Sequence, residues 1–149
     1  MSKKTSKTKY NKAKRTGRPE AASESFYNKH PLWAFQRCDF DHPEWGMACN
    51  ADMLNKVFKY LSGLESQSWG EILSATSGRK HNTRNHLIQL IRLDTKAQKR
   101  ASEINIDEFD GLYSIATQSL MRIWGLITNG VFYVIWFDPK HEIYPTSKT

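Results

Sequence analysis

The sequence predicts an α+β fold, in which an N-terminal strand and two or three helices pack on an antiparallel sheet that ends in a C-terminal hairpin. Three observations lead to this prediction. Apolar residues alternate near the start of the expected domain, recur every three or four residues in the middle, and form two β-rich runs near the end. This order of elements is typical of helices packed on one sheet. Residues 1–24 are expected to be a disordered basic arm, and residues 25–149 a single domain.

The first expected strand covers residues 33–40, with the sequence WAFQRCDF. Its alternation places Trp33, Phe35 and Arg37 on one face and the intervening side chains on the other. Pro43 follows soon after, and proline cannot donate a hydrogen bond in a sheet. We therefore expect the strand to end before the segment Asp41-His42-Pro43.

Helices are expected in the middle of the chain. One begins at Asn50 or Ala51, because apolar residues then recur at helical spacing, at Leu54, Val57, Phe58, Leu61 and Leu64. Ser68 resembles a helix cap, Glu71 completes a capping box, and a short turn follows over residues 69–75. After a polar, basic loop at residues 77–86, the apolar residues of segment 87–91 (Leu87, Leu90 and Ile91) fit a further helical stripe. Residues 95–102 are compatible with another helix.

The strongest structural signal is a hairpin formed by residues 121–128 and 131–138 around Asn129-Gly130. This dipeptide favours a type I′ turn, because both turn residues need positive φ. The register predicted from this turn pairs Thr128 with Val131, Leu126 with Tyr133, Trp124 with Ile135, and Arg122 with Phe137. Strand alternation puts Trp136 on the face of Phe132 and Val134. Both faces are apolar, so we expect central strands that are covered by helices, with residues 112–116 pairing alongside.

The net charge of +7 is unevenly distributed. Residues 1–18 hold eight of the 22 basic residues and none of the 15 acidic ones, so the rest of the chain carries a net charge of −1. Such an arm is either a solubilising tail or a tether to RNA, DNA or a ribosome. A second basic run spans residues 79–100, where only Asp94 is acidic. Its candidate nucleic-acid contacts are Arg79, Lys80, Arg84, Arg92, Lys96 and Arg100.

Several classes of protein and site are not expected. No run approaches the roughly 18 apolar residues of a membrane span, and no apolar stretch of a secretory signal follows the basic N-terminus. The two cysteines are too few for a disulfide scaffold, so we expect a cytoplasmic protein. The spacing of Cys38, His42 and Cys49 matches no usual zinc site, which favours buried, inert cysteines. We therefore expect neither a metal nor a cofactor.

The element order, together with the segments Leu112–Ile115, Arg122–Leu126 and Val131–Glu142, resembles the RelE/YoeB/ParE superfamily of small bacterial toxins. The likeness extends over residues 33–145 and follows a layout of Leu-Tyr, Arg-Ile, hairpin and His. The resemblance implies a toxin-like ribonuclease that cleaves messenger RNA, often on the ribosome. It also implies neutralisation by an antitoxin protein.

Candidate catalytic residues lie at the end of the hairpin. Such cleavage needs a base for the ribose 2′-hydroxyl, cations for the developing phosphorane charge and an acid for the leaving oxygen. Arg122 would stabilise the phosphate and His141 would act as acid or base, while Lys140 adds a cation and Tyr144 stacks on a base or assists proton transfer. Structural roles compete with these assignments: Arg122 would pair with Asp138 or Glu142, and His141 would be a cap or a surface residue.

Two functions without catalysis also remain open. One is a nucleic-acid- or ribosome-binding module, in which the arm and residues 79–100 contact phosphates. The other is a protein-interaction subunit of a bacterial defence or toxin–antitoxin system, in which exposed aromatic residues contact the partner. An enzyme needs Arg122, Lys140 and His141 to converge on one pocket, whereas a binding module needs only a continuous basic face.

Overall fold

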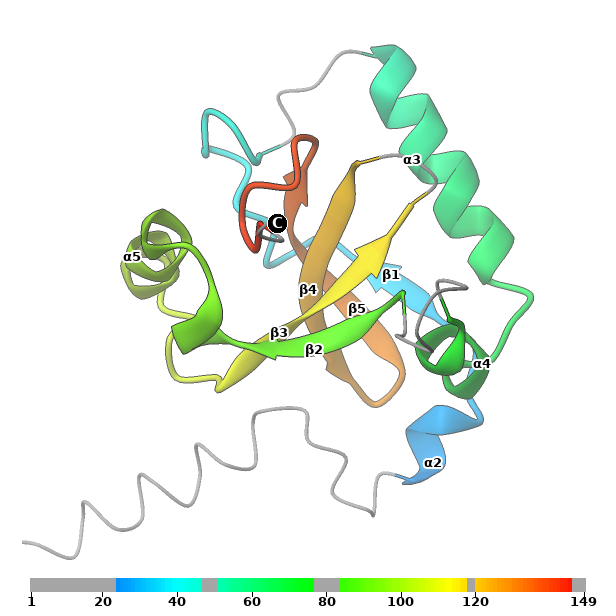
Figure 1. Ribbon diagram of the computed structural model, residues 1–149. Coiled ribbons are helices and arrows are strands. Elements are labelled where there is room, and N and C mark those ends of the chain that lie inside the picture. Colours follow the sequence, from blue (N-terminus) through cyan, green and yellow to red (C-terminus); the bar gives the residue numbers. More distant parts are fainter. Residues whose placement is uncertain (1–23, 47–50, 77–83, 118–119, 146–149) are drawn as a thin grey trace, which may run out of the picture.

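A five-stranded mixed sheet forms the centre of the computed structural model, which describes residues 24–46, 51–76, 84–117 and 120–145 (Figure 1). The strands are β1 (Leu32–Ala34), β2 (His86–Gln89), β3 (Gly111–Ala116), β4 (Arg122–Thr128) and β5 (Val131–Asp138). They lie in the order β1-β5-β4-β3-β2, and β1 runs parallel to β5 while the other neighbours are antiparallel. The predicted α+β class and hairpin are confirmed, but the sheet is mixed. Strands β1 and β5 run parallel, and the long connection between them contains the other three strands and most of the helices.

Helices cover both faces of the sheet (Figure 1). They are α2 (Glu24–Tyr27), α3 (Ala51–Leu64), α4 (Trp69–Ser74), the 3₁₀ helix η2 (Leu90–Arg92) and α5 (Thr95–Glu103). Val57, Leu61 and Leu64 of α3 pack with α2 and α4 on one face. Ala97 and Ala101 of α5 pack on the other face, where their small side chains bring the helix close to the sheet. The sheet is therefore buried on both sides, as the apolar faces of the hairpin predict.

The local signals for the helices and the hairpin turn are confirmed. Helix α3 begins at Ala51, and α5 occupies the segment that is compatible with a helix. Ser68 Oγ accepts a hydrogen bond from the Glu71 amide at 3.2 Å, and Glu71 Oε1 accepts one from the Ser68 amide at 2.9 Å, so the capping box is complete. Asn129 and Gly130 have φ values of 52° and 85°, as a type I′ turn requires.

Two sequence predictions about the early elements are wrong. The first strand ends at Ala34, and residues 35–41 continue as a loop. The apolar run after residue 86 forms strand β2 and the single turn η2 instead of a longer helix. Leu87 packs against the core cluster that includes α3 and α4, and Ile88 belongs to the cluster that includes α5, so both faces of this short strand contact the core. Pairing with β3 decides its conformation, and the apolar spacing alone does not.

A β-bulge changes the predicted register of the hairpin. The pairs Thr128–Val131 and Leu126–Tyr133 are confirmed, but Trp124 pairs with Trp136 and Arg122 with Asp138. Ile135 is the extra residue, so Ile135 and Trp136 both face α5, and the predicted position of Trp136 beside Phe132 and Val134 is wrong. The Ile135 carbonyl accepts the Asp39 amide at 3.0 Å, so the loop after β1 docks at the bulge.

Candidate nucleic-acid interface

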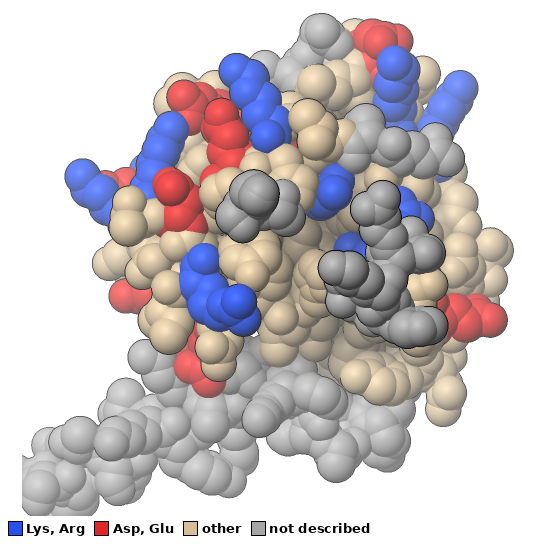
Figure 2. Space-filling view, in the orientation of Figure 1, with Lys and Arg blue, Asp and Glu red and all other residues tan. Residues whose placement is uncertain are grey.

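Arg84, His86 and Arg122 come together at one end of the sheet, and we call them the basic cluster. His86 begins β2 beside β3, and Arg122 begins β4 opposite Ala116, the last residue of β3. In Figure 2, Lys and Arg side chains lie in the middle of the face, where β3 ends and β4 begins. The cluster therefore combines residues that are far apart in the sequence.

Buried Asn85 fixes the two basic residues that flank it. Its Nδ2 donates to the Ile72 carbonyl and its Oδ1 accepts the Ala116 amide, both at 2.8 Å. These bonds tie the start of β2 to α4 and to the end of β3. Arg84 Nη2 donates to the Thr117 carbonyl at 3.0 Å, so its guanidinium lies against the connection between β3 and β4.

The basic cluster is electrostatically strained. Burial lowers the pKa of Arg122, and the positive charge of Arg84 lowers it further. Burial also lowers the pKa of His86, with Arg122 as the second cause, so the neutral imidazole is favoured near neutral pH. The negative charge of Asp138 raises the pKa of Arg122 and so opposes these two causes. The Asp138 carboxylate, however, also accepts hydrogen bonds from the backbone amides of Glu142 and Ile143, at 2.8 and 2.9 Å. A bound anion would relieve the repulsion between the two arginines.

The turn after β5 holds two of the four catalytic candidates. His141 has a φ of 58° and donates its amide to the Asp138 carbonyl at 3.4 Å, while Lys140 is exposed. Asp138 is fully buried, and its two hydrogen bonds from backbone amides hold the turn in place. Arg122 and His141 both act electrostatically on this carboxyl group. The turn thus lies next to the basic cluster, with the Asp138 carboxylate as their common neighbour.

Tyr144 belongs to another part of the fold. Its hydroxyl accepts a hydrogen bond from Arg92 Nη2 at 3.0 Å, and the guanidinium carbon lies 5.7 Å from the ring centroid. The Asp94 amide also donates to the Ile143 carbonyl at 2.8 Å, which fixes this segment at the start of α5. The four catalytic candidates therefore lie in three places: Arg122 in the basic cluster, Lys140 and His141 in the neighbouring turn, and Tyr144 beside Arg92.

The remaining basic candidates do not form one continuous face. Lys96 forms an ion pair with Glu44, and Arg100 forms ion pairs with Asp39 and Glu103. Around α5, on the left in Figure 2, basic and acidic side chains are interspersed. Arg79 and Lys80 lie outside the described residues. Of the predicted nucleic-acid contacts that the structure describes, only Arg84 lies in the basic cluster, and Arg122 joins it from the predicted catalytic set.

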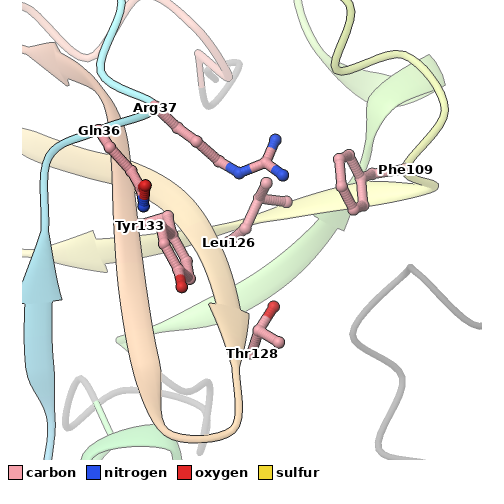
Figure 3. Close-up of a pocket in the computed structure, with 6 residues that line it drawn as sticks. All are labelled: Gln36, Arg37, Phe109, Leu126, Thr128 and Tyr133. Carbon is pink, nitrogen blue, oxygen red and sulfur yellow. The ribbon is translucent and has the colours of Figure 1, made fainter.

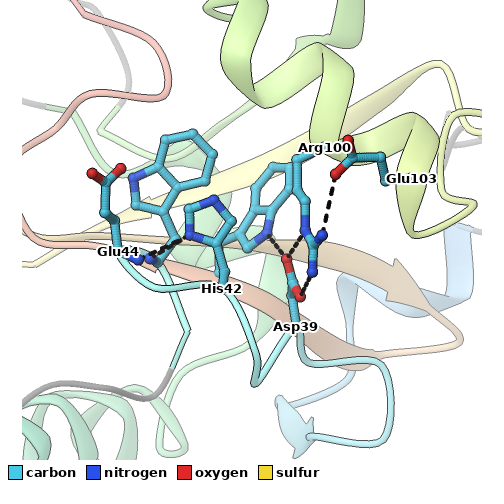
Figure 4. Close-up of polar contacts among 7 residues, drawn as sticks. Asp39, His42, Glu44, Arg100 and Glu103 are labelled. Carbon is cyan, nitrogen blue, oxygen red and sulfur yellow. Dashed lines mark hydrogen bonds and ion pairs between the residues drawn. The ribbon is translucent and has the colours of Figure 1, made fainter.

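Sequence reasoning missed a buried polar network around Asp39 (Figure 4). The carboxylate accepts Arg100 Nε at 2.8 Å and Nη2 at 2.6 Å, and Trp136 Nε1 at 2.9 Å. Burial raises the pKa of Asp39, but the hydrogen bonds from Arg100 and Trp136 outweigh it and hold the pKa below its usual value. The alternation of residues 33–40 suggested a strand there, and no sequence signal connects Asp39 to Arg100. The network fastens the loop after β1 to α5.

His42 and Cys38 flank this network, whereas Cys49 lies outside the described residues. His42 Nδ1 accepts the amides of Glu44 and Trp45 at 3.0 and 2.9 Å, and the imidazole stacks on the Trp45 ring at 4.4 Å. Burial, and then the charge of Asp39, raise the pKa of the Cys38 thiol to about 11, so it stays protonated at neutral pH. In the part of the chain that the structure describes, no three His, Cys, Asp or Glu residues form a group able to hold a metal ion.

No protein-family model, curated protein or solved structure matches the chain. Within the described ranges, none of the helices has the length and apolar character needed to cross a membrane.

Proposed function

We propose that this protein is an RNA-binding module whose basic cluster contacts the phosphate backbone. One observation carries the proposal: Arg84, His86 and Arg122 converge at one end of the sheet closely enough for Arg84 to lower the pKa of Arg122, and for Arg122 to lower that of His86. Converging arginines are the usual phosphate contacts of nucleic-acid-binding proteins. The sequence immediately before Arg84 adds Arg79 and Lys80, and the arm adds eight further basic residues. The resemblance to RNA-cleaving toxins favours RNA over DNA.

A structural role for the two arginines is the competing explanation. Arg84 donates to the Thr117 carbonyl, and Arg122 Nη1 donates to the carbonyls of Leu120 and Met121 at 3.1 and 3.0 Å. Both side chains thus brace the connection between β3 and β4. A bracing role predicts a loss of stability on substitution, whereas a phosphate contact predicts a loss of RNA affinity and a weaker salt dependence. The two explanations are therefore separable.

Arg84→Gln and Arg122→Gln are each expected to weaken the binding of single-stranded RNA roughly fivefold, about 1 kcal/mol for one charged contact. Each should also reduce the slope of log affinity against log salt concentration by about 0.7, the value for one phosphate contact on a single strand. Fluorescence anisotropy of a labelled oligonucleotide over a range of salt concentrations measures both quantities. A DNA strand of the same sequence tests the preference for RNA.

Lys59→Gln is the matched control for this experiment, because it removes one charge from the exposed surface of α3 at a residue outside the basic cluster. Its affinity and salt slope should match those of the unmodified protein. Thermal unfolding of each variant identifies any loss that comes from misfolding. If both cluster variants keep the original affinity and slope, or if Lys59→Gln lowers them equally, the cluster is not the binding site.

Ribonuclease activity is the second candidate function, and the position of His86 favours it. Burial and the nearby Arg122 favour the neutral imidazole of His86, the form that accepts a proton from a ribose hydroxyl. Arg84 and Arg122 would then stabilise the charge that develops on the phosphate. In this arrangement His86 is the base, whereas the sequence predicted His141 as the acid or base.

His86→Gln is expected to abolish RNA cleavage, if the protein cleaves RNA, while His141→Asn should preserve it. Asparagine tolerates the positive φ of residue 141, so the second variant keeps the turn intact. Gel analysis of a labelled RNA would show fragments that end in a 2′,3′-cyclic phosphate, the product of attack by the 2′-hydroxyl. The reverse pattern of losses would assign the base to His141, and intact RNA with the unmodified protein would leave binding as the function.

A further inference from the structure

A second candidate site lies at the hairpin end of the sheet, far from the basic cluster (Figure 3). It is a hollow of about 330 Å³, close to the lower limit for small-molecule pockets. We call it the Arg37 hollow; its lining residues are Gln36, Arg37, Phe109, Leu126, Thr128 and Tyr133. Thr128 and Arg122 are the two ends of β4, about 20 Å apart at the usual rise of a strand. The hollow and the cluster can therefore be tested separately.

Two aromatic rings hold the Arg37 side chain in place. Its guanidinium carbon lies 5.7 Å from the centroid of Phe109 and 5.9 Å from that of Tyr133. In Figure 3, Arg37 extends from the loop after β1 across Leu126 toward Phe109. Stacking of this kind orients the flat guanidinium without using its N–H donors.

Arg37 differs in this respect from the arginines at α5 and η2. Arg100 donates to two carboxylates, and Arg92 donates to the Tyr144 hydroxyl. No carboxylate among the described residues forms an ion pair with Arg37. An oriented guanidinium with available donors recognises a pair of adjacent acceptors, and the two common examples in nucleic acids are phosphate oxygens and the O6/N7 edge of guanine.

The surrounding charges favour the base over the phosphate. Phe109 stands between Glu108 and Asp110, both exposed, and Asp41 lines the neighbouring hollow. The negative charge of these carboxylates repels a phosphate group, whereas a nucleobase is uncharged and is not repelled. The half-buried rings of Phe109 and Tyr133 provide surfaces on which a base stacks, and the Gln36 amide and Thr128 hydroxyl add hydrogen-bonding groups.

We propose that the Arg37 hollow binds a guanine base, with the Arg37 guanidinium donating to O6 and N7. The biological source of that base, an RNA strand, rests on the proposed RNA-binding function; a free guanine nucleotide is the other source with the same chemistry. A neighbouring hollow of about 370 Å³ shares Gln36 and Arg37 and contains Phe40, whose residue surface is 53% exposed. The exposed Phe40 ring in this neighbouring hollow provides a second aromatic surface for the next base of a strand.

Titration of the full chain with mononucleotides tests the proposal. GMP should bind at least about tenfold more tightly than AMP or UMP, the discrimination typical of one bidentate arginine–guanine contact. Inorganic phosphate should not displace GMP. NMR chemical-shift changes or calorimetry give the affinities, and the pentanucleotides UUGUU and UUAUU distinguish the two sources. If UUGUU binds more tightly than GMP, the source of the guanine is an RNA strand. If the two bind equally, the source is the free nucleotide. Either result requires the guanine site.

Arg37→Lys keeps the positive charge but removes the paired donors, so GMP affinity should fall about tenfold, to the level of AMP. Arg92→Lys is the matched control, because Arg92 also stacks on a tyrosine ring but lies outside the hollow, and it should leave GMP binding unchanged. Equal affinities for GMP, AMP and UMP would overturn the guanine site, as would displacement by phosphate or unchanged GMP affinity in Arg37→Lys.

The outcome for the guanine site is distinguishable from the outcome for the proposed function. If GMP selectivity depends on Arg37 while Arg84→Gln and Arg122→Gln bind RNA like the unmodified protein, the guanine site stands and the proposed role of the basic cluster fails. If the cluster variants lose RNA affinity while UUGUU and UUAUU bind equally, the cluster stands and the guanine site is overturned.

Discussion

Asp39→Ala is expected to lower the free energy of unfolding by about 3 kcal/mol, the lower part of the range for breaking a buried ion pair. The Asp39 side chain is 3% exposed, whereas that of Arg100 is 27% exposed and keeps its contact with Glu103. The substitution leaves the Arg100 guanidinium without its main acceptor, and the Trp136 indole N–H loses its acceptor as well. For a chain of this length, the melting temperature should fall by roughly 10 °C.

The same substitution should change the response of the protein to acid. Because the pKa of Asp39 is lowered in the folded state, its carboxylate stabilises the fold above the ordinary value of 3.8, and this stability is lost as the pH falls further. Burial lowers the pKa of His42, so this residue also costs stability as the pH falls below its ordinary value of 6.5. The pKa of His86 is lowered in the same way, so both histidines contribute to the upper step. The unmodified protein should therefore lose stability in two steps, and Asp39→Ala should keep only the upper step.

Urea unfolding from pH 8 to pH 3 measures both effects. Asp41→Ala is the control, because this exposed carboxylate lies two residues away, and a change within about 0.5 kcal/mol is expected there. Equal losses in Asp39→Ala and Asp41→Ala would show that the buried network does not stabilise the fold. An unchanged lower step in Asp39→Ala would assign the acid sensitivity to another carboxylate.

Local sequence signals predicted those elements whose conformation depends on near neighbours. Asn129-Gly130 fixed the turn, and Ser68 with Glu71 fixed the start of α4, because the groups that bond are only a few residues apart. Strand β2 was missed because its apolar residues fit a helix equally well, and only pairing with β3 makes it a strand. The bulge was missed because alternation assumes one residue per position on each strand, and Ile135 breaks that assumption.

The candidate sites depend even more on tertiary structure. Arg122 was identified from its place on the predicted hairpin, but its neighbours Arg84 and His86 reach it only through the order of β2, β3 and β4. Arg37 was assigned to a strand face, whereas it lies in a loop and stacks on Phe109, which is 72 residues further along the chain. For the bulge, by contrast, the sequence does hold a partial signal. Gly125 is a glycine within an apolar strand, and such a glycine often marks a bulge or a close approach of two backbones.

Gly125→Ala is expected to lower the free energy of unfolding by about 3 kcal/mol, the upper end for overpacking a core. A Cβ atom at this position would overlap the Tyr133 carbonyl oxygen and would lie 2.7 and 2.8 Å from two ring carbons of Phe132. Phe132 is fully buried, so its ring has no free space into which it can move. Strand β5 lies this close to β4 beside the bulge, and the extra methyl group would push the central pair of strands apart.

Gly63→Ala gives a control of opposite sign. Gly63 lies exposed in α3, and a Cβ atom there meets nothing within 4 Å. The change should stabilise the fold by about 0.5–1 kcal/mol, because alanine loses less backbone entropy in a helix. Chemical unfolding of both variants measures the difference, and near-ultraviolet circular dichroism reports the packing of the buried aromatic rings. If Gly125→Ala were as stable as the unmodified protein, β4 and β5 would not be in close contact at the bulge, and the position of Trp136 beside Asp39 would lose its explanation.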